Sequence, residues 1–462
     1  MQKQTDIGPE KLIAFGKTLT GRLVLPSDDD FDETRKVYNG MIDKRPKLFA
    51  MCTDATDVVK AVNFGRNNNL LVSVRGGGHN GAGLGVCDDG LVIDLSGIKH
   101  IEVNTKNNTV KVGGGSIWVD VDRVTHEFDL AVPSGMISTT GVGGLTLGGG
   151  VGYLTRKFGL TIDNLLEAEM VLADGSFVTV NADKHTDLFW AIRGGGGNFG
   201  VVTSFTFQAH PVATIFGGPT LWPIEQIEEI MEWYDGFIHN APEDLNGFIA
   251  TMIIPESPFP EHLHNKNFCG IVWCYTGDME KAEEAFAPIM AKKPLFAHVG
   301  QMPYPAIQQL FDGFFPTGLQ WYWRADFFNE LGPEVRAQHL KFGSDIPTPL
   351  SQMHLYPISG AASRVGATDT PWAYRDAKYA GVYLGVSPDA AAADKITKWS
   401  KAYYEALHSY SAGGAYSNFM MNEGEARVKA SYKHNYARLA EIKSAYDPDN
   451  FFRVNQNIVP RT

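Results

Sequence analysis

Cysteine is scarce in this chain, with four residues among 462. Four cysteines are too few for the disulfide framework of a small secreted protein, and none belongs to a Cys-x-x-Cys pair of the kind found in zinc and redox sites. Long apolar runs are missing too, since none approaches the roughly 18–20 residues of a membrane-spanning helix. Lys and Arg number 40 against 52 Asp and Glu. Because nucleic-acid backbones are bound by clustered Lys and Arg, this balance argues against a nucleic-acid partner.

The N-terminal segment and the chain length further limit the class of protein and its domain organisation. Residues 1–10 hold no apolar stretch of the kind that forms a secretory signal. Together with the few cysteines, this predicts a reduced, cytoplasmic protein with no membrane segment. The hydrophobic fraction of 44% is ordinary for a globular protein. The length exceeds what one small core fills, so we expect two or three lobes.

Glycine is abundant, and 26 of the 49 glycines lie between Gly76 and Gly200. They alternate with short apolar runs of strand character, which is unlike a flexible Gly/Ser linker. Loops of this kind can place consecutive backbone amides around a ligand. The alternative is a β-rich domain with many tight turns.

Hydrophobic periodicity divides the chain into two regions near residue 210. Before it the pattern predicts an α+β arrangement with helices over 54–69 and 116–128. Strands are expected there over 70–74, 91–95, 101–103, 110–112, 165–172, 177–180 and 201–207. After it, helices are expected over 223–238, 279–291, 333–342, 394–408 and 425–445. Strands are expected over 246–254, 268–276, 319–328, 352–358 and 380–386, which favours a largely antiparallel sheet covered on one face by helices.

One glycine run, Gly195–Gly200, satisfies the GxGxxG fingerprint of nicotinamide-binding domains. A Rossmann turn lies between a preceding strand and a following helix. Here a helical pattern over 187–192 precedes the run and a strand pattern over 201–207 follows it. The first acidic residue beyond the run is Glu225, further on than the ribose-binding carboxylate would be. The run therefore argues against a nicotinamide domain, although its backbone can still approach a ligand.

Two other segments point more specifically to a bound cofactor. Arg75–Asn80, which reads RGGGHN, follows an expected buried strand, and its consecutive amides can form a nest for a pyrophosphate. Arg75 can add charge or brace the loop, and the imidazole of His79 can project from it. The alternative is that His79 is a loop histidine with no ligand. A second glycine-rich run, Ser138–Gly152, can contact the same ligand from the other side.

Several ordered segments together resemble one family, the covalent flavin oxidoreductases of the vanillyl-alcohol oxidase and p-cresol methylhydroxylase superfamily. The chain is most similar to its berberine-bridge-enzyme and 6-hydroxynicotine-oxidase branch, and the resemblance covers nearly the whole length. The segments that carry it are Arg75–Asn80, Pro133–Gly152, Arg156–Asn164, Gly195–Thr203 and Tyr446–Ile458.

The resemblance implies an α+β fold with FAD held in a domain of two α+β subdomains, residues 1–213. A substrate domain with a large antiparallel sheet covered by helices is expected over 214–412, and residues 413–462 should return to the FAD-binding domain. The implied activity is removal of a hydride from an alcohol or amine carbon of a small organic molecule such as a sugar, alkaloid or polyketide, with O2 reduced to H2O2. A flavin-linked dehydrogenase that uses another acceptor and a flavin-binding protein without turnover are the alternatives.

The resemblance also implies how FAD is attached. His79 matches the histidine that the family bonds to the 8α-methyl group of the flavin. Many members of the branch add a bond from a cysteine, but Ile137 stands at that position here and has no nucleophile. Leu145 stands where the family often has histidine. One covalent bond, through His79, and an active site that is apolar on that side are therefore expected, and Cys87 is interpreted as a packed residue.

Three residues are implied to take part in the reaction. Thr140 matches the position that gates oxygen, and because Thr is nearly isosteric with the Val of oxidases it favours an oxidase. Tyr416, with Asn418, matches a Tyr-x-Asn segment beside the flavin and is the first candidate to receive a proton. Its phenol, with a solution pKa near ~10, would then need a nearby cation or the field of the flavin to act at pH 7. The alternative is that it orients substrate by a hydrogen bond. Candidates for that cation, each alternatively a structural ion-pair partner, are Arg324, His354, Arg364 and Arg375.

The cofactor-binding residues implied by the resemblance lie mostly in the glycine-rich segments and the tail, and no metal ligand is expected. They are Arg75, Gly76, Gly77, Gly78, His79, Asn80, Gly81, Ser134, Gly135, Ser138, Thr139, Gly141, Gly143, Gly144, Gly148, Asp163, Asn164, Gly200, Val202, Asn455 and Asn457.

Overall fold

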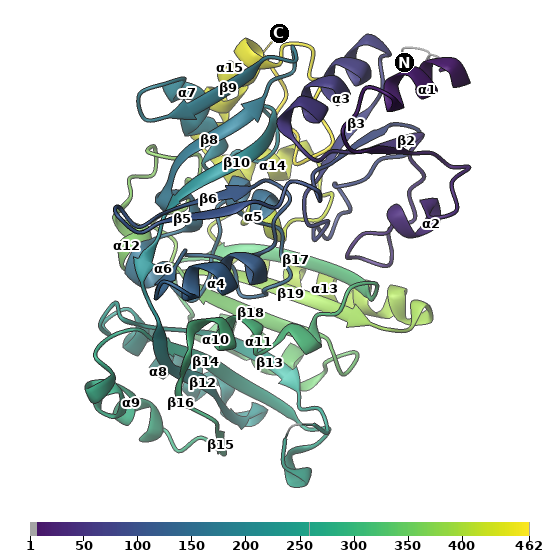
Figure 1. The fold of residues 1–462 in the computed structure, drawn as a ribbon. Helices are drawn as coiled ribbons and strands as arrows, with labels where there is room; N and C mark the ends of the chain where they lie inside the picture. Colours follow the sequence, from purple (N-terminus) through teal and green to yellow (C-terminus); the bar gives the residue numbers. More distant parts are fainter. Residues whose placement is uncertain (1–6, 258, 462) are drawn as a thin grey trace.

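The structure is a computed structural model that describes residues 7–257 and 259–461 (Figure 1). The first six residues of the N-terminal segment discussed above lie outside the described residues. In the described part, the long strands form three sheets of four, five and eight strands. The α+β class and the large antiparallel sheet expected from the sequence are confirmed.

The four-stranded sheet lies nearest the N-terminus. Its strand order is β1 (Arg22–Val24), β2 (Leu48–Met51), β4 (Leu91–Asp94) and β3 (Val72–Arg75). β4 pairs in parallel with both β2 and β3, and helix α3 (Ala55–Asn67) connects β2 to β3. The carboxylate of Asp54 caps α3 by accepting a hydrogen bond from the amide of Asp57. β3 ends at Arg75, and the first glycine-rich loop begins there.

The five-stranded sheet is antiparallel throughout. Its strand order is β5 (Ile101–Asn104), β6 (Thr109–Gly113), β10 (Val201–Gln208), β8 (Leu165–Val171) and β9 (Phe177–Asn181). Helix α7 (Thr186–Ile192) precedes the Gly195–Gly200 run and β10 follows it. This order is the reverse of a Rossmann turn, as the sequence predicted.

The eight-stranded sheet is built from residues 214–387, and all its pairs are antiparallel. Its order is β15 (Phe296–Ala297), β12 (Thr214–Pro223), β14 (Asn267–Tyr275), β13 (Leu245–Ile253), β18 (Gln352–Pro357), β19 (Tyr379–Ser387) and β17 (Gln320–Phe328), with β16 (Gly300–Pro303) also paired to β12. β12 was not predicted from the sequence, because Gly217, Gly218 and Pro219 are untypical of a strand interior. Its pairing with β14, which is distant in sequence, sets its extended conformation. The domain boundaries expected at residues 213 and 412 remain predictions.

The two faces of this sheet have different neighbours. Helices α8 (Ile227–Ile238), α9 (Ala282–Met290), α11 (Pro333–Ser344) and α13 (Ala393–His408) pack on one face around Trp273. Because side chains alternate along a strand, the residues between those of the helix-covered face point the other way. That second face, which includes Phe248 and Trp323, belongs to the core shared with the first half of the chain. The shared core is where the site lies.

Shorter elements connect these sheets. The remaining helices are α1 (Pro9–Gly16), α2 (Phe31–Thr34), α4 (Trp118–His126), α5 (Val142–Gly148), α6 (Thr155–Phe158), α10 (Tyr304–Gln309) and α12 (Ala361–Arg364), and β7 (Leu130–Ala131) pairs with β11 (His210–Pro211). The 3-10 turns are η1 (Thr161–Asn164), η2 (Ile224–Gln226), η3 (Glu261–Leu263), η4 (Met279–Lys281), η5 (Asp312–Phe314), η6 (Ala390–Ala392) and η7 (Ser417–Phe419).

The prediction of one continuous helix over 425–445 is wrong. The structure has α14 (Glu425–Tyr432) and α15 (Asn435–Tyr446), separated at Lys433, where φ is 47°. The side-chain amide of Asn435 donates to the carbonyls of Ala367 and Thr370, so a tertiary contact fixes the turn. The tail then runs back to the first half of the chain, and its end lies beside α15, where Arg461 contacts Ala437, Glu441 and Ser444 (Figure 1).

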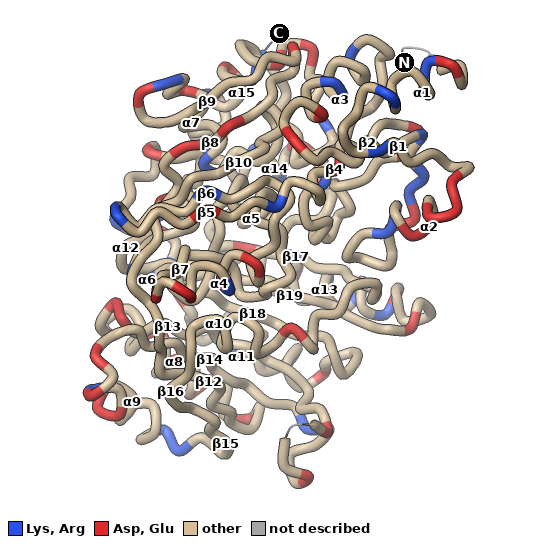
Figure 2. Tube along the Cα trace, in the orientation of Figure 1, with Lys and Arg blue, Asp and Glu red and all other residues tan. Residues whose placement is uncertain are grey.

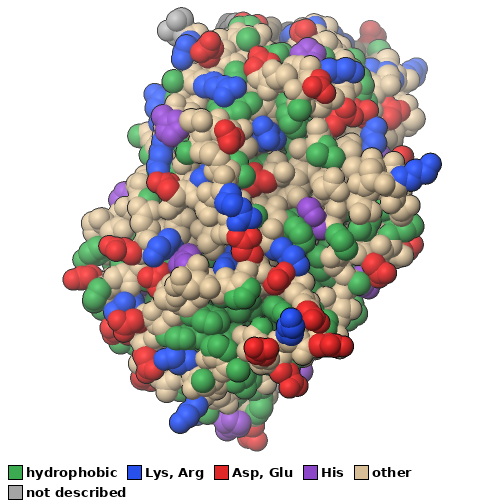
Figure 3. All heavy atoms as spheres, turned by 90° about the vertical axis from the view of Figure 1, so that its left-hand side faces the viewer, with side chains coloured by type: hydrophobic (Ala, Val, Ile, Leu, Met, Phe, Trp, Pro, Cys, Tyr) green, Lys and Arg blue, Asp and Glu red, His purple; other side chains and the backbone are tan. Residues whose placement is uncertain are grey.

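Charged residues lie mostly on outer helices and loops (Figure 2). On the face shown in Figure 3, acidic and basic side chains are interspersed, and apolar side chains gather over its lower part. Within residues 7–257 and 259–461, no helix is long and apolar enough to cross a membrane, and no group of His, Cys, Asp and Glu is placed to hold a metal ion.

The two halves of the molecule are joined by a buried arginine. Arg156, in α6, is 1% exposed and donates to the hydroxyl of Ser359 at 3.0 Å and to three backbone carbonyls that follow α8. Those carbonyls belong to Ala241, Pro242 and Leu245. Two of the acceptors, the Ser359 hydroxyl and the Leu245 carbonyl, belong to buried residues and depend on the guanidinium for these hydrogen bonds.

Arg156→Met should therefore lower the thermal unfolding midpoint markedly, because each buried acceptor left unsatisfied costs about 1–3 kcal/mol. Arg364→Met is a matched control, because Arg364 pairs with Glu243 in the same region but its side chain is 62% exposed. Exposed ion pairs contribute little, so the control should melt close to wild type. Calorimetry of both holoproteins makes the comparison, and equal midpoints for the two variants would contradict this role of Arg156.

Candidate active site

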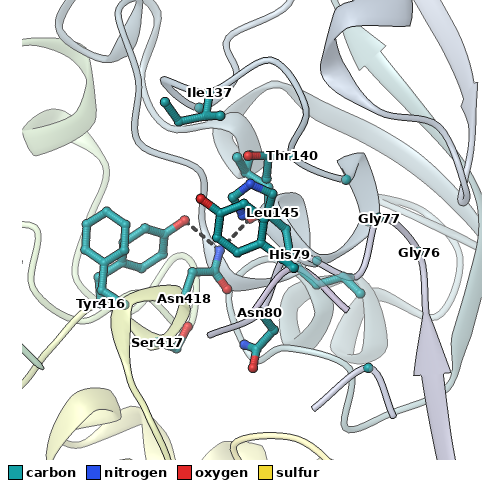
Figure 4. A pocket seen from close by; sticks show the side chains of 18 of the residues that line it. Gly76, Gly77, His79, Asn80, Ile137, Thr140, Leu145, Tyr416, Ser417 and Asn418 are labelled. Carbon is teal, nitrogen blue, oxygen red and sulfur yellow. Dashed lines mark hydrogen bonds between the residues drawn. The ribbon is translucent and has the colours of Figure 1, made fainter. Parts of the chain in front are cut away.

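A cavity of about 340 Å³ lies where the glycine-rich loops, the eight-stranded sheet and the C-terminal tail meet (Figure 4). A cavity needs about 10–15 Å³ to hold one water, so this one has room for a much larger organic molecule. The loops contribute one wall and the inner face of the sheet contributes the opposite wall. A ligand held by the loops would thus lie against the sheet.

Most of the residues implied by the resemblance meet at this cavity. Those that line it are Arg75, Gly76, Gly77, Gly78, His79, Asn80, Gly135, Thr140, Gly141, Gly143, Gly144, Gly200, Val202, Tyr416, Asn418 and Asn455. Asn455 also donates to the carbonyl of Gly197 at 3.1 Å, which fixes the tail against the Gly195–Gly200 run. Three distant parts of the chain therefore converge here.

The other implied residues lie outside the cavity wall, and they are Gly81, Ser134, Ser138, Thr139, Gly148, Asp163, Asn164 and Asn457. Several have structural partners instead. Ser138 donates to Asp312 at 2.5 Å, and Ser134 accepts from Gln308 at 2.5 Å. A Cβ at Gly81 would come within 2.1 Å of the Trp323 ring, and one at Gly148 within 2.2 Å of the Asn418 amide. Contact of these residues with a cofactor stays a prediction.

Asp163 and Asn164 hold the backbone of η1 in place. Asp163 forms a bidentate ion pair with Arg375, with both N–O distances at 2.7 Å, and accepts from the amide of Leu160. Asn164 donates to the carbonyls of Phe158 and Leu160. These contacts stabilise the turn η1, which belongs to one of the segments that resemble the family.

The two glycine-rich loops touch through their backbones. A Cβ on Gly77 would come within 2.6 Å of both the Cα and the amide nitrogen of Gly141, so no side chain fits between them. At Gly144 and Gly197, which also line the cavity, an added Cβ would meet no protein atom within 4 Å. The space in front of these two glycines is open cavity, which fits a cofactor that contacts backbone.

Arg75 braces the first loop. It is buried, pairs with Asp94, and donates to the carbonyl of Thr34 at 2.6 Å and to that of Lys36 at 3.3 Å. These contacts engage Nε and Nη1 of the guanidinium with acceptors of the protein itself. Of the two roles considered for Arg75, the structure favours the brace.

His79 lies on the cavity wall with an unused nitrogen. Its ring stacks on Tyr38 with 3.8 Å between ring centroids. Burial lowers the pKa of His79 to about 4, so the imidazole is neutral at pH 7. In the described part of the chain, its buried Nε2 has no hydrogen-bond partner. A buried polar atom without a partner is costly unless a ligand engages it, and a neutral imidazole nitrogen is a nucleophile.

The positions around His79 offer no second nucleophile of this kind. Ile137 and Leu145 both line the cavity, and among the described residues no cysteine does. Cys87 is buried with its sulfur 3.8 Å from the carbonyl oxygens of Leu71 and Leu91, as expected for a packed residue. The residues present therefore fit FAD attached through histidine alone.

Tyr416 is held by two donors (Figure 4). Its phenol oxygen accepts from the amide of Gly150 at 2.8 Å and from Nδ2 of Asn418 at 2.7 Å. Burial raises the pKa of the phenol well above its usual range, so the group is un-ionised at neutral pH. With both lone pairs engaged, its remaining capacity is to donate its own proton.

The cation expected beside Tyr416 is not supplied by the arginines that were considered. Each has an acidic partner elsewhere: Arg324 with Glu423 at 3.0 Å, Arg364 with Glu243, and Arg375 with Asp163. The prediction that one of these arginines supplies a cation beside Tyr416 is therefore wrong, because each guanidinium forms a salt bridge with its own acidic partner. The alternative, structural ion pairs, is confirmed.

A polar cluster on β18 was missed by the sequence reasoning except for His354. Gln352, His354 and Tyr356 alternate along the strand, and all three line the cavity. Nδ1 of His354 lies 2.7 Å from the Tyr356 hydroxyl, and Nε2 lies 2.9 Å from Oε1 of Gln352. Since that amide oxygen only accepts, Nε2 carries the proton and Nδ1 accepts from the phenol. Burial lowers the pKa of His354 to about 3, so the histidine is neutral and supplies no cation.

Comparisons with known proteins agree with this geometry. A family profile described as FAD binding domain matches residues 46–181, and one described as berberine and berberine-like matches residues 415–459. An FAD-linked oxidoreductase of Dictyostelium discoideum is 30% identical over 467 residues, which cover 100% of this chain and 99% of the relative. (R)-6-hydroxynicotine oxidase of Paenarthrobacter nicotinovorans is 30% identical over 477 residues, covering 97% of this chain and 98% of the relative.

Solved structures agree as well. The crystal structure of 6-hydroxy-D-nicotine oxidase from Arthrobacter nicotinovorans matches with a TM-score of 0.86 at 26% identity, covering 96% of this chain and 98% of that one. Xylooligosaccharide oxidase from Myceliophthora thermophila shares the fold, with a TM-score of 0.86 at 19% identity over 98% of this chain and 99% of that one. These matches over full length, with a cavity whose residues fit FAD, show that the chain belongs to the berberine-bridge-enzyme-like branch of the vanillyl-alcohol oxidase superfamily of FAD-linked oxidoreductases.

Proposed function

We propose that this protein is an oxidase that carries FAD on one covalent bond to His79 and oxidises a small organic substrate with O2. The substrate loses a hydride from an alcohol or amine carbon together with a proton, and O2 takes up both electrons to give H2O2. The observation that carries the proposal is the neutral His79 imidazole, whose Nε2 has no hydrogen-bond partner among the described residues, in a cavity whose opposite wall is the large sheet. Relatives named as oxidases support it.

The backbone of the loops is suited to hold the cofactor. When bound, FAD supplies the hydride acceptor. The amides around Gly76–Gly78 and Gly141–Gly144 would bind it, because both segments line the cavity and present backbone there. Arg75 and its partner Asp94 keep the first loop in position, and a bond to His79 would hold the cofactor in the cavity.

The chain's polar groups in the cavity orient substrate as neutral partners. Tyr416 donates its phenol proton toward a substrate oxygen, since its lone pairs already accept from Gly150 and Asn418. Asn418 itself is fixed by donating to the carbonyl of Leu145 at 3.1 Å. An un-ionised phenol is a poor proton acceptor, so we assign Tyr416 to orientation, which is the alternative left open by the sequence.

Acid precipitation of the wild-type protein should leave flavin in the pellet, and a flavin-bearing tryptic peptide should contain His79. In His79→Ala, FAD should become dissociable and substrate oxidation slower, because the bond fixes the ring and raises its potential. Cys87→Ala is the matched control and should keep its flavin bound. Release of all wild-type FAD into the supernatant would rule out the covalent bond.

Tyr416→Phe should slow anaerobic flavin reduction by about 2–13-fold, the value of one hydrogen bond of roughly 0.5–1.5 kcal/mol. Loss of a general base would instead cost about 10²–10⁴-fold. Tyr383→Phe is a control, because Tyr383 is buried in the helix-covered core, lies outside the cavity wall, and its hydroxyl has no hydrogen-bond partner among the described residues. Stopped-flow absorbance measures both variants, and a loss of 10² or more in Tyr416→Phe would make Tyr416 the base.

Thr140→Leu should slow reoxidation of reduced enzyme by O2 and leave anaerobic reduction by substrate nearly unchanged. Thr140 lines the cavity, so the added bulk would obstruct oxygen sterically. Thr139→Leu is the control, since Thr139 is exposed and lies outside the cavity wall. If Thr140→Leu reoxidises as fast as wild type, the gate is absent. Slow reoxidation of the wild type itself would indicate a dehydrogenase.

A further inference from the structure

The sheet side of the cavity carries no ionised side chain. Among the described residues 214–412 that line it, none is Asp, Glu, Lys or Arg. Most are aromatic or aliphatic, such as Phe248, Val272, Trp323 and Leu384. Strand alternation explains this composition, because these positions face the shared core while their neighbours pack against the helices.

Charge is balanced over the rest of the wall too. Within the described part of the chain, Arg75 is the charged residue that lines the cavity, and it lies on the loop side in an ion pair with Asp94. A substrate with a carboxylate or an ammonium group would lose its water here without gaining a counter-charge, which is costly. The cavity therefore selects against ions of either sign, including amines that are protonated at neutral pH.

Polar groups on the sheet side are few. Gln352, His354 and Tyr356 already bond to one another, and the buried indole N–H groups of Trp321 and Trp323 have no hydrogen-bond partner among the described residues. The Nε2 amide of Gln352 forms no hydrogen bond with the described residues, and Tyr356 can still accept one. An oligosaccharide has many hydroxyls to satisfy, whereas this wall satisfies one polar end.

We propose that the substrate is a neutral alcohol with an apolar, ring-bearing body, and that a hydroxyl of it binds at the Gln352–His354–Tyr356 cluster. This rests on the proposed function, because it takes the sheet side of the cavity as the substrate site. Aromatic walls bury a ring efficiently, and the cluster on β18 gives the ring its orientation.

The first test titrates the dithionite-reduced holoenzyme anaerobically with four probes by calorimetry. They are 4-methylbenzyl alcohol, its anionic analogue 4-(hydroxymethyl)benzoate, its cationic analogue 4-(aminomethyl)benzyl alcohol, and xylobiose. We expect the neutral alcohol to bind at least tenfold more tightly than each of the others. Equal or tighter binding of a charged probe or of xylobiose overturns the proposal, and so does the absence of binding by all four. Since reduced flavin cannot accept a hydride, binding is measured without reaction. A failure of the oxidase function would show up separately, as probes that bind the reduced enzyme but do not bleach the oxidised enzyme.

The second test removes the amide of Gln352. Wild type should prefer 4-methylbenzyl alcohol over 1-ethyl-4-methylbenzene, and Gln352→Met should reduce that preference by about 2–13-fold. Phe248→Leu is the matched control, because Phe248 packs on Tyr356 with 5.1 Å between ring centroids and forms no side-chain hydrogen bond. It should weaken both probes alike. An unchanged preference in Gln352→Met overturns the role of the cluster, and the four-probe series on wild type decides the substrate class whether or not this variant retains flavin.

Discussion

The backbone contact between Gly77 and Gly141 is the constraint on which the site depends. It brings together two loops that are far apart in sequence, so that His79 and Thr140 reach the same cavity. The second loop is held in place by backbone hydrogen bonds to residues 116–118. The amide of Trp118 donates to the carbonyl of Thr140, and the amide of Val142 donates to that of Ser116. A side chain at either glycine would push the loops apart and separate the histidine from the rest of the wall.

The opposite wall is positioned by buried polar contacts between the two halves. Arg156 donates to carbonyls after α8, and Asn246 donates from β13 to the carbonyls of Gly152 and Tyr153 at 3.0 and 2.9 Å. Hydrogen bonds are directional, whereas apolar packing alone tolerates sliding. The distance across the cavity is thus set by the same segment, residues 152–156, that follows the second glycine-rich loop.

Much of this arrangement could be predicted from the sequence because its causes are local. The glycine-rich runs, the strands that alternate and the helix over 54–69 are each determined by neighbours in the chain. The break at Lys433, the strand β12 and the ion pairs of Arg324 and Arg375 depend on partners that are distant in sequence. The β18 cluster carried a local signal, the spacing of Gln352, His354 and Tyr356, but nothing in the sequence showed that their face meets the cavity.

Apart from Arg75, the titratable groups on the cavity wall share one property, which is that burial keeps them neutral. The imidazoles of His79 and His354 have lowered pKa values, the phenol of Tyr416 has a raised one, and the arginines once considered for this place are neutralised elsewhere. In such surroundings each hydrogen bond is stronger than in water, because the local dielectric is low. Under the proposed function, the protein would therefore orient substrate by shape and by a few hydrogen-bonding dipoles, and the cofactor would take up the large change of charge during the reaction.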